Sequence, residues 1–127
     1  MKFNNEALFK ELVTRHGLNL YLGAGFSTYA YNEDGDSLPL GEAINSRLID
    51  LFELDKNRNL TLSKTCQKIK KDNEDVLEKY FKEIYTVKTF DNEYITITRL
   101  PIKNIVTTNI DNLLEKIYSH PDSMAEL

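Results

Sequence analysis

The residues most able to do chemistry begin with a glycine-rich motif at residues 23–27 (Gly-Ala-Gly-Phe-Ser), directly after an apolar run at residues 19–22. Glycines at the end of a strand let the backbone turn sharply, and they let backbone N–H groups approach a diphosphate without interference from a Cβ atom. If a helix follows, its N-terminus adds a favourable field for the anion. A turn that simply needs flexible glycines explains the same residues. The motif alone leaves both interpretations open.

A second polar motif at residues 107–111 (Thr-Thr-Asn-Ile-Asp) follows another apolar run. In open α/β sheets, ligands bind outside the carboxyl ends of the strands. An asparagine side chain offers a donor and an acceptor, and an aspartate offers acceptors only. Such a pair can hold a carboxamide or a ribose hydroxyl. Because Thr, Asn and Asp are also good helix N-caps, a capping role is the alternative.

Neither motif matches the two commonest nucleotide-binding fingerprints. Thr28 stands where the dehydrogenase motif G-x-G-x-x-G has its third glycine, and no acidic residue follows a second strand about 20 residues on. No Gly-Lys-Ser/Thr follows the glycines, so the motif is not the phosphate loop of NTPases.

The elements that must position these motifs follow from the apolar patterns. Helices are predicted over residues 4–16, 40–54, 62–69, 73–85 and 111–118, with Asn4 or Asn5 as the first cap. Buried strands are predicted over residues 19–22 and 105–108, and the β-branched run at residues 94–98 favours a third strand. Two strands separated by helices predict a parallel pair in a helix-rich α/β fold. Since stable sheets usually have four or more strands, we expect a partial, truncated Rossmann-like sheet.

Taken together, the two motifs resemble those of the sirtuin superfamily, which has Gly-Ala-Gly-x-Ser near the start and Thr-x-Asn-x-Asp at a later strand end. The Leu-Pro-Leu-Gly stretch at residues 38–41 and Leu-Leu-Glu at residues 113–115 are closer to a bacterial sirtuin-like branch. Members of that branch serve as NAD-consuming domains in anti-phage defence proteins. The resemblance covers residues 18 to 117 and implies that residues 1–127 are the N-terminal part of a sirtuin-type domain. It also implies a helix, not a strand, at residues 94–98.

The resemblance assigns roles to individual residues. Asn109 matches the active-site asparagine needed for cleavage of NAD, and Asp111 matches the aspartate that helps hold the nicotinamide carboxamide. The family's catalytic histidine lies downstream of the asparagine motif, beyond the end of this chain. The single cysteine, Cys66, excludes the four-cysteine zinc ribbon of protein-deacylating sirtuins, so no metal is expected. The residues that match the cofactor-binding loop and the strand end lining the pocket are Gly23, Ala24, Gly25, Phe26, Ser27, Thr107 and Thr108.

Composition narrows the partners and the compartment. The net charge is -4, with no basic stripe of the kind that binds nucleic acid. No apolar run approaches a membrane span, and the sequence carries no export signal, so we expect a cytoplasmic protein. The expected function is that of an NAD glycohydrolase acting on the nicotinamide–ribose bond. The alternatives are a non-catalytic module that binds NAD or ADP-ribose, and an assembly module whose open strand edges pair with the rest of a parent domain or with an oligomer partner.

Overall fold

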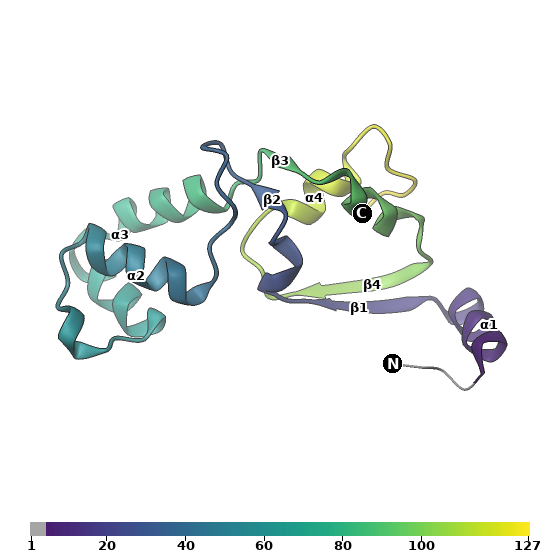
Figure 1. The fold of residues 1–127 in the computed structure, drawn as a ribbon, viewed down its shortest axis with the longest axis horizontal. Coiled ribbons are helices and arrows are strands. Elements are labelled where there is room, and N and C mark those ends of the chain that lie inside the picture. Colours follow the sequence, from purple (N-terminus) through teal and green to yellow (C-terminus); the bar gives the residue numbers. More distant parts are fainter. Residues whose placement is uncertain (1–4) are drawn as a thin grey trace.

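A parallel pair of strands lies at the centre of the computed structural model, which describes residues 5–127 (Figure 1). Strand β1 (Leu18–Leu22) pairs with β4 (Ile102–Thr107), and the register places Leu20 opposite Ile105 and Leu22 opposite Thr107. The carboxyl ends of both strands therefore meet at one end of the sheet, and both polar motifs leave from there. The predicted α/β fold and its parallel pair are confirmed, with β4 beginning three residues earlier than predicted.

Neither strand is buried as the sequence predicted. In β1 and β4 no residue is fully buried, and on one face Tyr21 is 79% and Val106 51% exposed. These two residues are register partners, so one face of the pair is open over its apolar centre. The prediction of two buried strands is wrong within residues 5–127, because the packed cores of the molecule form elsewhere.

The first helix, α1 (Glu6–His16), lies beyond the amino end of β1. Asn5 caps it by accepting a hydrogen bond from the Leu8 amide at 3.0 Å, while the alternative start at Asn4 lies outside the described residues. Gly17 ends the helix with φ +74°, a conformation that L side chains rarely adopt, as predicted. The helix has no buried residue, and Leu8 and Leu12 on its apolar face are about half exposed.

Two further helices form a separate helical lobe to one side of the sheet (Figure 1). Helix α2 (Gly41–Leu51) is shorter than predicted, because the chain turns at Glu53 with φ +52°. Helix α3 (Leu62–Tyr85) joins the two predicted helices of residues 62–69 and 73–85 into one, with a kink at Asn73. The helical lobe has its own core of buried residues: Ile44, Leu48, Ile69, Leu77 and Ile84.

The second core lies beside the sheet. A short antiparallel ladder of β2 (Ala30–Tyr31) and β3 (Thr89–Phe90), which the sequence did not predict, and helix α4 (Leu113–Tyr118) contribute to it. Its buried residues are Ala30, Leu38, Val87, Leu113 and Ile117. Tyr85 packs partly buried against both cores, so it lies where the two lobes meet.

Three 3₁₀ helices complete the fold: η1 (Ala24–Ser27), η2 (Lys56–Arg58) and η3 (Asn92–Arg99). The strand that β-propensity favoured at residues 94–98 is wrong. Ile95 and Thr98 are both buried, and their spacing of three residues places them on one side of a 3₁₀ helix. The helical conformation that the resemblance implied is the one the chain adopts. No helix within residues 5–127 has the length and apolar character needed to cross a membrane.

Candidate functional site

Three side chains from the two motifs form one hydrogen-bonded network at the carboxyl ends of β1 and β4. The Ser27 hydroxyl donates to Asp111 Oδ2 at 2.8 Å, across 84 residues of sequence. The Asn109 amide donates to the Gly23 carbonyl at 3.0 Å and lies 3.2 Å from Ser27 Oγ. We call these three side chains the Ser27–Asn109–Asp111 network. The structure thus brings together the residues that the sequence singled out in two separate places.

Tyr94 holds the glycine loop in position from the neighbouring helix η3. Its hydroxyl donates to the Phe26 carbonyl and accepts from the Tyr29 amide at 3.1 Å. The rings of Phe26 and Tyr94 meet edge to face, 5.2 Å apart between centroids. Burial raises the pKa of Tyr94, so its hydroxyl remains a donor at neutral pH. Phe26 therefore anchors the loop in the core, while Ser27, only 3% exposed, faces the network.

The second motif is fixed by its own backbone contacts. The Thr107 hydroxyl oxygen accepts a hydrogen bond from the backbone N–H of Asn109 at 3.0 Å. The backbone N–H of Thr108 donates to the Leu22 carbonyl at 3.4 Å. Asp111 uses Oδ1 to accept from the Leu113 amide at 3.0 Å, at the start of α4. One oxygen of Asp111 therefore binds the first residue of α4, and the other belongs to the network.

The two glycines of the loop are not required by the fold. Gly23 has φ -109°, and within residues 5–127 only Gly17 and Gly35 among the glycines have positive φ. A Cβ atom added at Gly23 or Gly25 would meet no atom within 4 Å. The open space over the loop is what a ligand in close contact with the backbone would need.

The glycine loop is followed by a short 3₁₀ turn and not by an α-helix. Helix η1 is a 3₁₀ turn of 4 residues, and the chain then enters β2. A turn of this length lacks the aligned peptide dipoles of a long helix. The condition under which a helix N-terminus would contribute to anion binding is therefore not met at this loop.

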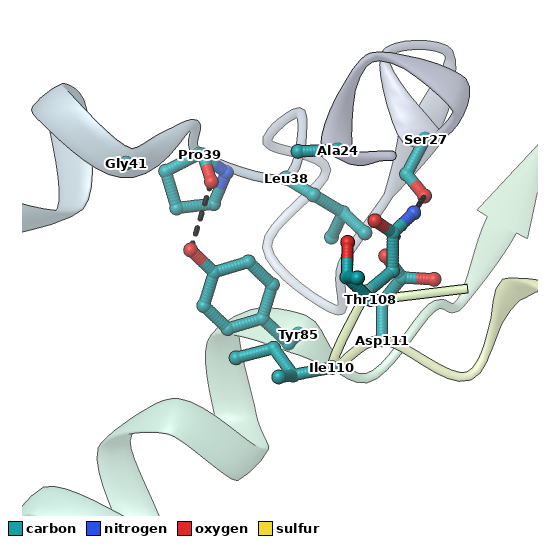
Figure 2. A pocket seen from close by; sticks show the side chains of 10 residues that line it. Ala24, Ser27, Leu38, Pro39, Gly41, Tyr85, Thr108, Ile110 and Asp111 are labelled. Atoms are coloured by element: carbon teal, nitrogen blue, oxygen red, sulfur yellow. Dashed lines mark hydrogen bonds between the residues drawn. The ribbon is translucent and has the colours of Figure 1, made fainter. Parts of the chain in front are cut away.

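A small cavity of about 140 Å³ opens beside the network (Figure 2). Its polar wall is formed by Ser27, Thr108, Asn109 and Asp111. Its apolar wall comes from Ala24, Leu38, Pro39 and Ile110, with Gly41 and Tyr85 from the helical lobe. Pockets for drug-sized ligands run to about 300–1,000 Å³, so this cavity suits one small ring and not a whole dinucleotide.

Among the residues expected to bind cofactor, Ala24, Ser27 and Thr108 line this cavity, together with Asn109 and Asp111. Gly25 and Phe26 border a different, apolar groove against η3, and Thr107 lies behind the network. Sequence analysis missed Tyr85 and Asn112. The Tyr85 hydroxyl donates to the Pro39 carbonyl at 2.8 Å, and the Asn112 side chain accepts from the Val87 amide at 2.7 Å. In the sequence Tyr85 is one more aromatic residue at the end of a helical pattern, which gives no signal of this contact.

The two histidines lie away from the cavity. His16 ends α1, at the opposite end of β1 from the network. His120 accepts from the Asp122 amide through Nδ1 at 3.1 Å, and its ring contacts Phe90. The titratable side chains that line the cavity are Asp111 and Tyr85. Residues 5–127 contain no group of three or more His, Cys, Asp or Glu side chains that could hold a metal ion.

Comparisons with known proteins returned no match. No family model fits the chain, and neither the curated proteins nor the solved structures include a chain that matches it.

Proposed function

We propose that this chain is the N-terminal part of a sirtuin-type domain that binds NAD at the carboxyl ends of β1 and β4. The observation that carries the proposal is the Ser27–Asn109–Asp111 network, which joins two motifs more than 80 residues apart in sequence. Its position fits the general rule for open α/β sheets, in which ligands lie outside the carboxyl ends of strands. The resemblance to the sirtuin superfamily rests on the same residues.

Each part of the site suits a part of NAD. The open backbone at Gly23 and Gly25 allows a diphosphate to approach the N–H groups of the loop. The cavity of about 140 Å³ offers amide, hydroxyl and carboxylate groups to a carboxamide, with an apolar wall for the ring. We therefore orient NAD with its diphosphate over the loop and its nicotinamide in the cavity.

The reaction proposed for the parent domain is hydrolysis of the nicotinamide–ribose bond. The C–N bond breaks as nicotinamide leaves with the bonding electron pair, and a water oxygen bonds to the ribose carbon and loses a proton. The products are nicotinamide, ADP-ribose and a proton. The ribose passes through an oxocarbenium-like state, as in glycoside hydrolysis. Asn109 orients the ribose and the attacking water, and by resemblance the reaction serves anti-phage defence.

A second candidate, binding of NAD or ADP-ribose without cleavage, is favoured by the hydrogen bonding of Asp111. Its Oδ2 accepts from Ser27 and its Oδ1 from the Leu113 amide, so both oxygens already have donors. A general base must reach the proton that it removes, either directly or through one water. Neither histidine of the chain lines the cavity. The described residues thus supply contacts for NAD more clearly than they supply a base.

NAD turnover and NAD binding, measured together, test the proposal. Nicotinamide release and isothermal titration with NAD and ADP-ribose are measured for the wild-type chain and for Asn109→Ala. The matched control is Asn104→Ala on β4, an exposed asparagine whose side chain donates to Asn19 Oδ1 at 2.8 Å and does not line the cavity.

Each outcome has a distinct meaning. Release that needs Asn109 and not Asn104 supports the hydrolase. Binding without release supports the non-catalytic module. If the wild-type chain binds neither NAD nor ADP-ribose, the proposal is refuted.

A further inference from the structure

Tyr85 occupies the junction between the helical lobe and the site. It is the last residue of α3, and its ring packs against both hydrophobic cores. Its hydroxyl donates to the Pro39 carbonyl at 2.8 Å, and Figure 2 shows the ring beside Ile110 at the wall of the cavity. Burial raises the pKa of Tyr85, and the nearby Asp111 carboxylate adds to the increase, so the hydroxyl is a protonated donor at neutral pH.

The Tyr85–Pro39 hydrogen bond ties together the two segments that connect the helical lobe to the sheet. Pro39 lies just before α2, whose first residue, Gly41, also lines the cavity. Two residues after Tyr85, the Val87 amide donates to the Asn112 side chain at 2.7 Å, directly beside Asp111. The segment after α3 is therefore fixed to Pro39 in the cavity wall through Tyr85, and to Asn112, the residue after Asp111, through Val87.

We infer that Tyr85 is a positioning residue that fixes the width of the cavity and so selects for the nicotinamide half of NAD. This inference rests on the proposed function. Tyr85 acts through Pro39 in the apolar wall of the cavity. Its hydroxyl holds residues 38–41 away from Thr108 and Asp111 in the polar wall, by the distance that a small aromatic ring between the two walls requires. ADP-ribose lacks the nicotinamide ring, so its affinity depends much less on this wall.

The size of the effect follows from the population of the closed cavity. A net hydrogen bond of about 1 kcal/mol corresponds to roughly a fivefold change in an equilibrium. Without the Tyr85–Pro39 hydrogen bond, residues 38–41 are held in place in only a fraction of the molecules. The apparent Kd for NAD rises by the inverse of that fraction. For Tyr85→Phe we expect an affinity for NAD that is weaker by up to about fivefold, and less than a twofold change for ADP-ribose.

Isothermal titration of both ligands into the wild-type chain, Tyr85→Phe and the control Tyr80→Phe tests the inference. Tyr80 lies on the same helix and packs in the helical lobe, but it does not line the cavity. The control is expected to bind both ligands as the wild type does. A Tyr85→Phe variant that weakens NAD and ADP-ribose equally, or neither, overturns the role of Tyr85 while leaving NAD binding intact. A wild-type chain that binds neither ligand refutes the proposed function itself.

A measurement on the wild-type chain keeps the inference testable if Tyr85→Phe does not fold. Amide hydrogen exchange is followed in the free chain, with NAD and with ADP-ribose. We expect NAD, and not ADP-ribose, to slow exchange in residues 38–41 and 85–88. Equal protection by the two ligands, or no protection in these segments, contradicts the inference.

Discussion

Replacing Gly25 by alanine is expected to separate the stability of the fold from its binding function. The Cβ of an alanine at this position meets no atom within 4 Å, and Gly25 does not have positive φ. A Gly→Ala change at a compatible position stabilises a protein by about 0.4–1 kcal/mol, because it restricts the unfolded chain. For a domain of this size that corresponds to a Tm increase of roughly 1–5 °C.

The same methyl group fills the open space over the loop in which the proposed diphosphate lies. A hydrogen bond to a charged group contributes about 1.5–3 kcal/mol, so the loss of one backbone contact weakens NAD binding about tenfold to a hundredfold. The assay is isothermal titration with NAD, paired with thermal unfolding of the same samples. The expected result for Gly25→Ala is an unchanged or higher Tm together with a much weaker affinity.

Gly35→Ala is the matched control, because at this position the backbone adopts a conformation that favours glycine. Its φ is +79°, and a Cβ there also meets no atom within 4 Å. A left-handed conformation costs an L residue about 1–2 kcal/mol, so Gly35→Ala is expected to lower the Tm and to leave NAD affinity unchanged. If Gly25→Ala instead lowers the Tm and binds NAD normally, the loop glycine serves the turn alone and the reasoning is refuted.

Three further predictions concern the groups that hold the site. Ser27→Ala leaves one part-buried carboxylate oxygen of Asp111 without its hydrogen-bond donor. We therefore expect the free energy of unfolding, measured with urea, to fall by about 1–3 kcal/mol. A change below about 0.5 kcal/mol would show that the Ser27–Asp111 hydrogen bond does not stabilise the fold. Tyr94→Phe removes the hydrogen bonds to Phe26 and Tyr29 and is expected to lower the free energy of unfolding by about 1–3 kcal/mol. In the control, Tyr118→Phe, the lost hydroxyl makes no hydrogen bond within residues 5–127, so equal losses in the two variants would contradict the role of Tyr94 in holding the glycine loop. Burial raises the pKa of Tyr94 and of Tyr118 above the ordinary 10.0, so both stabilise the fold fully below pH 10 and lose that contribution as the pH rises through their folded-state pKa values. The measurement is urea unfolding between pH 8 and pH 11, roughly the range that brackets the ordinary tyrosine pKa. The free energy of unfolding should decline less steeply with pH for Tyr94→Phe than for the wild type, and parallel curves would exclude a contribution from Tyr94.

Local patterns in the sequence predicted the elements but not their packing. The apolar runs, the cap at Asn5 and the stop at Gly17 located α1, β1 and β4 within a few residues, because these signals act within one turn of the chain. The burial of the strands was predicted wrongly, since burial depends on what covers Tyr21 and not on β1 itself. The β-branched residues of η3 pointed to a strand, but tertiary packing of Ile95 and Thr98 favours the 3₁₀ conformation.

The site was more predictable than the fold around it. Residue types and the parallel-strand rule were enough to place Ser27, Asn109 and Asp111 at one end of the sheet, where the network is found. Tyr85 and Asn112 were not predictable, because their contacts depend on how the helical lobe meets the sheet. The pattern of residues along the chain does not predict such contacts, because they also depend on how both lobes pack.

The most direct test of the central claim is an NMR titration of the ¹⁵N-labelled wild-type chain with NAD, read residue by residue. We expect the amides of residues 23–27 and 108–111 to shift together and to saturate with one Kd, since both motifs contact one molecule. Shifts confined to one motif, shifts centred on another surface, or none at millimolar NAD would contradict a shared NAD site.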